Sequence, residues 1–184
     1  MANVFTTLYP AIQNDPTTSS LLEQYVKKQT LPKGATLAIA GEINTRLYYI
    51  ETGLARVYYA DADADADDDT TAWLVVDGRF AVVPGSFFRQ QLSNYTIQLL
   101  ERSIVHSIGY DDLQQLYEAS VTVNMVARNV LEEYVLQYEW RVRLLQVRSC
   151  ERRYALFSRH FGKHMNRLQN KHIASFLGMT MVRP

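Results

Sequence analysis

Apolar residues follow a helical spacing at the start of the chain, a strand-like spacing in the middle and a helical spacing again towards the end. Residues 1–30 are predicted to be helical and to end before Pro32 and Gly34, because proline cannot continue a helix and glycine favours a turn. Over residues 31–110, short apolar runs alternate with turn residues, which is typical of a small β-barrel or sandwich. Helical spacing returns over residues 111–148. The pattern predicts an α+β fold.

Turns are predicted within the strand region at Gly41-Glu42, at residues 51–53 and at Asp77-Gly78. The runs Leu47–Ile50 and Ala55–Tyr59 flank a turn that ends at Gly53, and this arrangement predicts a β-hairpin between the two runs. Asp77 and Gly78 form a further turn pair. The remaining predicted strands lie over Trp73–Val76, Phe80–Val83 and residues 95–108.

Residues 61–69 contain six aspartates and three alanines. An EF-hand calcium loop needs a central glycine and a terminal glutamate, and this stretch has neither. Repulsion among the carboxylates and low β-propensity therefore predict a solvated loop, to which we assign no chemistry.

The long helical region over residues 111–148 is predicted to begin at Asp111 or Asp112, with a break near Ser120. Its apolar residues follow the 4-3-4-3 spacing of a coiled-coil seam: Leu131, Val135, Tyr138, Val142 and Leu145. One interpretation is a core helix buried within a single chain. The other, which we favour because a barrel largely fills itself, is a helix that covers the barrel on one side and forms a homodimer on the other.

The C-terminal residues 149–184 resemble the start of a DNA-reading unit. A helix over Glu151–Phe161 is closed by Gly162, and a second short helix carries Ile173 and Leu177 on one face. Gly178 then supplies a turn, and Thr180 is a suitable N-cap for a further helix. This order predicts a helix-turn-helix whose second helix is truncated, since only residues 181–184 follow. A chain of this length is expected to bind duplex DNA weakly and without sequence preference.

Charge supports the same interpretation in part. The net charge is zero, but the segment from Arg141 to Lys171 contains nine Arg or Lys residues against one Glu. Such a segment suits phosphate contacts, and it equally suits a solvated helix face. The predicted phosphate contacts are Arg167, Lys171, His172 and Thr180.

Several function classes are excluded by what the sequence lacks. Cys150 is the single cysteine, so neither an internal disulfide nor an iron–sulfur cluster can form. His160 and His164 have the spacing of two metal ligands, but Gly162 interrupts them and no zincin glutamate follows. No catalytic motif, cofactor site or metal site is predicted, so the expectation is a non-enzyme. Neither a membrane-length apolar run nor a signal peptide is present, which predicts a cytoplasmic protein.

A barrel, a long helix and a C-terminal helix-turn-helix, in this order, resemble the cyclic-AMP receptor/fumarate-nitrate regulator (Crp–Fnr) family of bacterial transcription factors. The resemblance rests on five stretches: Leu31–Gly34, Gly41-Glu42, Tyr48–Tyr58, Asp77–Phe80 and Lys171–Thr180. It implies a cyclic-nucleotide-binding-like barrel of the jelly-roll (double-stranded β-helix) type over residues 31–110. The long helix would be a dimerisation helix, and residues 149–184 a truncated winged helix-turn-helix.

The same resemblance implies that the cyclic-nucleotide cassette is degenerate. Family members that bind cyclic AMP use a Gly-Glu pair for the ribose and an Arg-Ser/Thr pair for the phosphate. This chain has Val82-Val83 and Ser93-Asn94 at the aligned positions, so both the acid and the cation are missing. The nearby Arg89 and Arg102 are expected to be solvated. Cyclic AMP is therefore not expected to bind in the usual way.

A pocket without its charged clamp could still accept a hydrophobic effector, or its residues could be ordinary barrel core. The residues concerned are Phe80, Val82, Val83, Phe87, Phe88, Ser93, Asn94 and Tyr95. Two function classes remain open. One is a dimeric transcriptional regulator that binds DNA and senses a small molecule or nothing at all. The other is a dimeric ligand-binding or interaction module without sequence-specific DNA binding.

Overall fold

The computed structural model describes residue 5, residues 9–60 and residues 69–179. The helices are α2 (Pro10–Gln13), α3 (Pro16–Tyr25), α4 (Pro84–Arg89), α5 (Tyr110–Ala119), α6 (Val121–Leu145), α7 (Cys150–Phe161) and α8 (Asn170–Phe176), with a 3-10 helix at Gly162–Arg167. The strands are β1 (Lys27–Leu31), β2 (Thr36–Ala38), β3 (Arg46–Thr52), β4 (Ala55–Ala60), β5 (Asp69–Val75), β6 (Arg79–Ala81), β7 (Thr96–Leu99) and β8 (Ser103–Gly109). These elements confirm the predicted α+β fold. The aspartate run over residues 61–68 and Thr180 lie outside the described residues.

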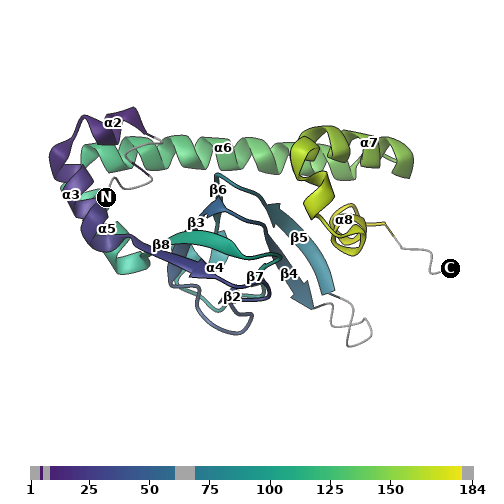
Figure 1. Cartoon of the computed structure of the whole chain (residues 1–184), viewed down its shortest axis with the longest axis horizontal. Coiled ribbons are helices and arrows are strands. Elements are labelled where there is room, and N and C mark those ends of the chain that lie inside the picture. Colours follow the sequence, from purple (N-terminus) through teal and green to yellow (C-terminus); the bar gives the residue numbers. More distant parts are fainter. Residues whose placement is uncertain (1–4, 6–8, 61–68, 180–184) are drawn as a thin grey trace.

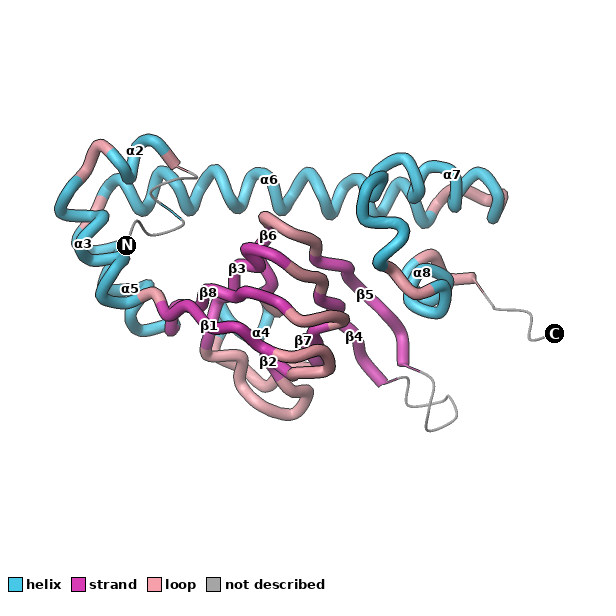
Figure 2. The backbone as a smooth tube through the Cα atoms, viewed as in Figure 1, coloured by secondary structure: helices cyan, strands magenta, loops and turns pink. Residues whose placement is uncertain are grey.

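The strands form a jelly roll of two four-stranded antiparallel sheets, ordered β1-β8-β3-β6 and β2-β7-β4-β5. Alternate residues of both sheets point inwards and meet in a core that includes Ile50, Val75 and Ile97. Figure 1 shows α6 crossing the length of the molecule above this barrel, with α3 and α5 near one end and α7 and α8 at the other. The backbone trace in Figure 2 shows the same arrangement, with α6 running along one side of the strands.

The predicted hairpin between β3 and β4 is wrong. Strand β3 pairs with β6 and β8, whereas β4 pairs with β5 and β7, so the turn at Gly53 carries the chain from one sheet to the other. Gly53 has a φ of 131°, and a Cβ there would lie 2.0 Å from Oγ of Ser103. Only glycine can occupy this position, because it needs both an unusual backbone conformation and room for a neighbouring strand. The sequence located the turn but not the partners.

Residues 27–30 are also not helical as predicted, because α3 ends at Tyr25 and the next residues form β1. β1 pairs with β8 over five residues, from Lys27 opposite Ser107 to Leu31 opposite Ser103. The free edge of β8 supplies hydrogen-bond partners that override the local helical spacing. α3 itself begins at Asp15, whose side chain accepts a hydrogen bond from the backbone N–H of Thr18 at 3.0 Å.

The predicted break at Ser120 is confirmed. Its hydroxyl accepts a hydrogen bond from the backbone N–H of Val123 at 3.1 Å and so caps α6. The prediction that Asp111 or Asp112 caps the preceding helix is wrong. Gly109 occupies that position, and the two aspartates lie in the first turn of α5, where the helix dipole favours negative charge. The long helix ends at Leu145 rather than near residue 148.

The C-terminal helices pack directly on the barrel. Gly162 ends α7 and Gly178 follows α8, both with positive φ, as the sequence predicted. An apolar cluster joins Phe157 and Phe161 of α7, Phe176 of α8 and Leu144 of α6 to Leu54 and Leu74 of the barrel. Helix α8 therefore lies against β5, as its place beside that strand in Figure 1 shows.

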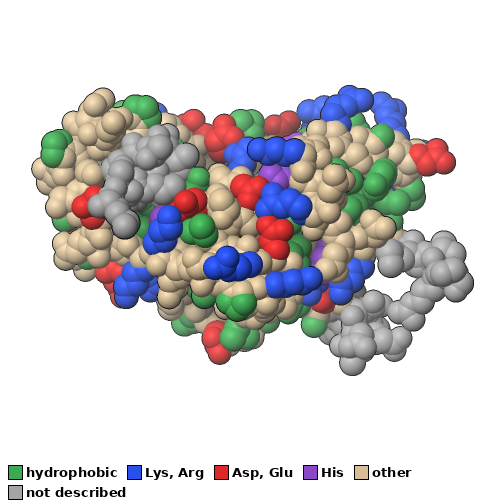
Figure 3. All heavy atoms as spheres, in the orientation of Figure 1, with side chains coloured by type: hydrophobic (Ala, Val, Ile, Leu, Met, Phe, Trp, Pro, Cys, Tyr) green, Lys and Arg blue, Asp and Glu red, His purple; other side chains and the backbone are tan. Residues whose placement is uncertain are grey.

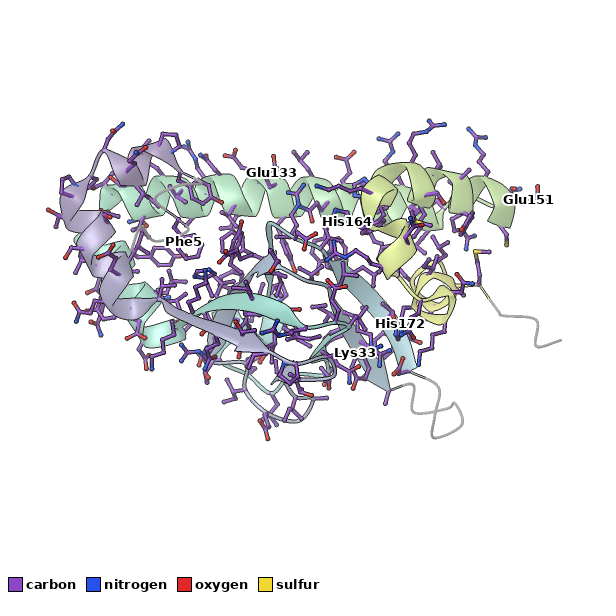
Figure 4. The ribbon with its side chains drawn as sticks, in the orientation of Figure 1. Phe5, Lys33, Glu133, Glu151, His164 and His172 are labelled. Carbon is purple, nitrogen blue, oxygen red and sulfur yellow. The ribbon has the colours of Figure 1, made fainter. Side chains whose placement is uncertain are left out.

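A buried polar contact pins α8 to sheet residues. Arg56 of β4 forms a two-pronged ion pair with Asp69, with N–O distances of 2.5 and 2.7 Å. The same guanidinium donates a hydrogen bond from Nη1 to Nδ1 of His172 at 3.3 Å, so this ring nitrogen carries no proton. Burial, and then repulsion from Arg56, lower the pKa of His172 to about 4. Figure 4 labels His172 on α8, facing the barrel.

This environment predicts that the protein loses stability as pH falls from about 6.5 to about 4. In the unfolded chain His172 binds a proton near pH 6.5, whereas the folded protein resists protonation to about pH 4. Within this window the unfolded state therefore binds more protons than the folded state, and the free energy of unfolding decreases as pH falls. The full stability is reached only above about pH 6.5. His172→Gln keeps an acceptor for Arg56 but cannot titrate, so its melting temperature should fall less than that of the wild type.

Melting curves between about pH 7 and pH 4.5 measure this difference. Asp77, whose pKa the Arg167 guanidinium lowers to about 2, is present in both proteins, so its contribution cancels in the comparison. Parallel loss of melting temperature in wild type and His172→Gln would contradict the prediction.

Candidate effector-binding site

A cavity of about 610 Å³ lies between sheet β2-β7-β4-β5, helix α4 and helix α6. β4 and β5 contribute one wall, with Val57, Tyr59 and Trp73. The turn after β6 contributes Val82 and Val83. The C-terminal half of α6 closes the cavity. A molecule of small-ligand size would therefore touch the barrel and the long helix together.

Aromatic rings line much of the cavity. Trp73 stacks on Tyr138 of α6, with ring centroids 4.7 Å apart, and lies 6.0 Å from Tyr134. On another wall, Tyr59 of β4 meets Tyr95 edge to face at 5.5 Å. Such rings can pack against a flat apolar body.

Near the positions of the expected cassette, two cavity-lining hydroxyls are already engaged. Ser93 donates to the backbone oxygen of Tyr95 at 2.7 Å and accepts from its N–H at 3.0 Å. Ser86 donates to the backbone oxygen of Gln91 and accepts from the N–H of Asn44. Val82 and Val83 are buried and apolar. The hydroxyl of each serine therefore already donates its proton within the chain and has none to donate to a sugar or a phosphate.

Two polar atoms of the cavity residues are buried and have no hydrogen-bond partner among the described residues. These are Nη1 of Arg141 on α6 and Oγ1 of Thr71 on β5. The Arg141 guanidinium lies 3.7 Å from the ring centroid of Phe176, above its face. Burial lowers the pKa of Arg141 to about 10, so the group still carries its charge at neutral pH.

The structure does not gather all the predicted pocket residues in one place. Val82, Val83, Ser93, Asn94 and Tyr95 line this cavity, whereas Phe80 and Phe88 line a second one. Phe87 is fully buried in the core beside α5, so for this residue the core interpretation holds. Arg89 and Arg102 are exposed, as expected.

The second cavity, of about 110 Å³, lies between the first helices, β8 and the N-terminal half of α6. Its lining is almost entirely apolar and includes Phe5, which Figure 4 labels beneath α6. Next to it, Nε2 of His106 lies 2.5 Å from Oε2 of Glu51, which also pairs with Lys28 at 2.8 Å. The imidazole and the carboxylate at this position are thus already paired.

Sequence reasoning missed Thr71, Trp73 and Arg141 as site residues. For Arg141 a signal existed: Tyr134, Tyr138, Arg141 and Leu145 share one face of a helix, and a cation within such an apolar stripe is unusual. The pairing of β5 with α6 is a tertiary contact, so no sequence pattern indicated Thr71 or Trp73.

The five predicted dimer residues all have substantially exposed side chains on α6. Val135 is the most exposed, at 66 %. The other four, exposed at 43–51 %, are Leu131, Tyr138, Val142 and Leu145. Three of these, Tyr138, Val142 and Leu145, also line the larger cavity. The alternative of a core helix buried within one chain therefore does not hold for this face.

Two of the predicted phosphate contacts are already engaged by other residues of the chain. Arg167 pairs with Asp77, with N–O distances of 2.5 and 3.0 Å, and with Glu101. His172 is buried and uncharged, as described above, so neither residue presents a free cation. Lys171 is exposed. Figure 3 shows Lys and Arg side chains gathered at the edge of the molecule over α7.

Two further features concern residue 5, residues 9–60 and residues 69–179. There, no group of three or more His, Cys, Asp or Glu side chains could hold a metal ion. None of its helices is long and apolar enough to cross a membrane. Cys150 is exposed at the start of α7.

Comparison with known proteins agrees with this geometry. The family model for the cyclic nucleotide-binding domain matches residues 28–120. No curated protein sequence matches the chain. Among solved structures, a Crp/Fnr-family transcriptional regulator from Eubacterium rectale is similar, with a TM-score of 0.71 and 16 % identity, over 92 % of this chain and 80 % of that one.

Two further structures have the same arrangement. FixK2 from Bradyrhizobium japonicum has a TM-score of 0.69 and 14 % identity, over 84 % of this chain and 78 % of that one. The c-di-GMP-responsive regulator CLP from Xanthomonas campestris has a TM-score of 0.68 and 15 % identity, over 90 % and 86 %. At these identities the likeness establishes the fold. Because the family model spans half of the sequence, the chain belongs to the cyclic nucleotide-binding domain family, and it shares the fold of Crp/Fnr regulators.

Proposed function

We propose that the protein is a Crp–Fnr-type transcriptional regulator whose barrel binds a small effector in the cavity beneath α6. The observation that carries this proposal is that one helix closes the cavity and also presents an exposed apolar face. A ligand in the cavity would contact the helix through which two copies pair. Ligand binding and subunit geometry would thus be coupled through residues that take part in both.

The proposed dimer uses the exposed seam of α6. Apolar side chains at helical spacing gain free energy when a second copy removes them from water. In this arrangement Tyr138, which stacks on Trp73, would contact the effector on one side and the second copy of the chain on the other. The protein would act in the cytoplasm, where its DNA target lies, and no catalytic step is proposed for it.

A second candidate function is a dimeric effector-binding or interaction module without sequence-specific DNA binding. The engagement of Arg167 and His172 with the barrel favours it, because both were expected to contact phosphates. The two candidates share the cavity and the dimer and differ in whether α8 leaves β5 to reach DNA.

We predict that Val135→Asp converts a dimer into monomers. The substitution places a charge in the centre of the seam, where pairing would bury it without a partner. Sedimentation velocity at about ten micromolar protein measures the change. Asn129→Asp is the matched control, since it adds the same charge on another face of α6. A wild-type protein that is already monomeric at high micromolar concentration would contradict the proposed dimer.

We predict that cyclic AMP binds no more tightly than about 1 mM. The ribose hydroxyls would meet Val82 and Val83, and each polar group buried without a partner costs about 1–3 kcal/mol. Isothermal titration calorimetry with cyclic AMP measures this. Saturation at micromolar concentration would show that groups outside the degenerate cassette hold the nucleotide.

A further inference from the structure

We propose that Arg141 and Thr71 form an anion-binding corner of the larger cavity, and that the effector is a monoanionic aromatic carboxylate. This inference rests on the proposed effector-binding function and specifies its ligand. The negative charge of the ligand would thus be bound by a residue of α6, not by the degenerate cassette.

The first support is the unusual state of Arg141. Its residue is only 9 % exposed, it forms no ion pair with any described residue, and Nη1 lacks a hydrogen-bond partner among them. A buried cation without a counter-charge is costly, and proteins normally pair it. Arg56 shows the ordinary solution in the same fold, because this equally buried guanidinium has Asp69 as a two-pronged partner. Arg141, which is one of the residues that line the larger cavity, has no such partner among the described residues.

The second support is Thr71, which is fully buried on β5. Its backbone N–H donates to Oγ of Ser175 at 2.8 Å, but its own hydroxyl has no partner among the described residues. Two unsatisfied polar groups thus occur among the residues that line one cavity. A carboxylate can accept hydrogen bonds from a guanidinium and a hydroxyl together, and would satisfy both.

The charge and the walls of the cavity set the class of ligand. Arg141 is the single charged side chain among its described lining residues, so one negative charge neutralises the site. Close to it, Tyr138 and Trp73 form a stacked pair, and Val57, Val82 and Val83 complete an apolar surface. This combination suits a flat apolar body better than a sugar. A cyclic nucleotide carries the anion but also brings ribose hydroxyls, for which Val57, Val82 and Val83 offer no partners.

The position of Arg141 also connects the anion to the C-terminal unit. The guanidinium lies over the ring of Phe176, and Phe176 belongs to the cluster that holds α8 on the barrel. An anion that draws the guanidinium towards the cavity would weaken this cation–π contact. Occupancy of the site would therefore be felt at α8.

The experiment compares two probes that share one aromatic body, 2-naphthoate and the neutral 2-naphthalenemethanol. Isothermal titration calorimetry of the full chain gives both affinities for the wild type, Arg141→Gln and Arg141→Lys. Arg143→Gln is the matched control, because Arg143 lies on the same helix with a side chain that is 77 % exposed. Its substitution should leave both affinities unchanged.

The wild type should bind the carboxylate more tightly than the alcohol. Arg141→Gln should weaken the affinity for the carboxylate about tenfold or more, since a hydrogen-bonded charge pair is lost. The affinity for the alcohol should change less than about twofold. Arg141→Lys should retain part of the preference, because it keeps the charge without the planar donor pair. The melting temperature of Arg141→Gln should not fall, because the substitution removes an unpaired buried charge.

The outcomes separate the two proposals. If both probes bind but their affinity ratio is the same in wild type and Arg141→Gln, the anion-binding corner is wrong and the effector cavity stands. If neither probe binds the wild type at millimolar concentration, the cavity is not an apolar effector site and both proposals fail. An Arg141→Gln protein that unfolds more readily would show that Arg141 is a structural contact for Phe176 rather than a ligand anchor.

Discussion

The stacking of Trp73 on helix α6 is the contact on which the rest of the site depends. The indole ring on β5 lies 4.7 Å from Tyr138, 6.0 Å from Tyr134 and 6.5 Å from Phe176. One side chain of the barrel thus touches both the long helix and the C-terminal helix α8. Aromatic contacts of this kind fix orientation as well as adding burial energy. They hold α6 beside the barrel at a separation that leaves a cavity between the helix and the sheet.

Two buried arginines, Arg56 and Arg141, differ in whether the chain supplies partners for their charge, and only Arg141 belongs to the candidate site. Arg56 and Arg141 both lie next to α8, one from β4 and one from α6. Arg56 is held by Asp69, Gln98 and His172, so its charge and its donors have partners within the chain. Arg141 has an aromatic ring on one side and an unpartnered nitrogen among the described residues. Selection for stability alone would favour an apolar residue there, which is why a binding role explains Arg141 better.

The order of segments could be predicted from the sequence because it depends on local patterns. Helical spacing in α6 and α7, the break at Ser120 and the glycines at 162 and 178 are properties of neighbouring residues, and the structure confirms them. Strand pairing is not local. Gly53 marked a turn, but the sequence did not show that the turn joins two different sheets. The strand β1 was taken for helix because its partner β8 lies about 75 residues further along the chain.

The candidate site was harder to predict than the fold for the same reason. The family resemblance located the Asp77-Gly78 turn before β6, and it predicted which cassette residues are missing. It could not indicate a charge supplied by another wall, because Arg141, Thr71 and Trp73 line one cavity only in the folded chain. Arg167 and His172 were predicted to contact phosphates. In the folded chain Arg167 pairs with Asp77, and His172 accepts a hydrogen bond from Arg56.

The central claim is that an aromatic anion binds between β5 and the C-terminal half of α6. Hydrogen–deuterium exchange of the full chain, with and without saturating 2-naphthoate, locates the bound ligand directly. The account predicts slower exchange in peptides that cover Asp69–Val75 and the end of α6 around Arg141, with little change in α3. Slower exchange confined to α3, β8 and the first half of α6 would place the ligand in the smaller cavity and contradict the claim.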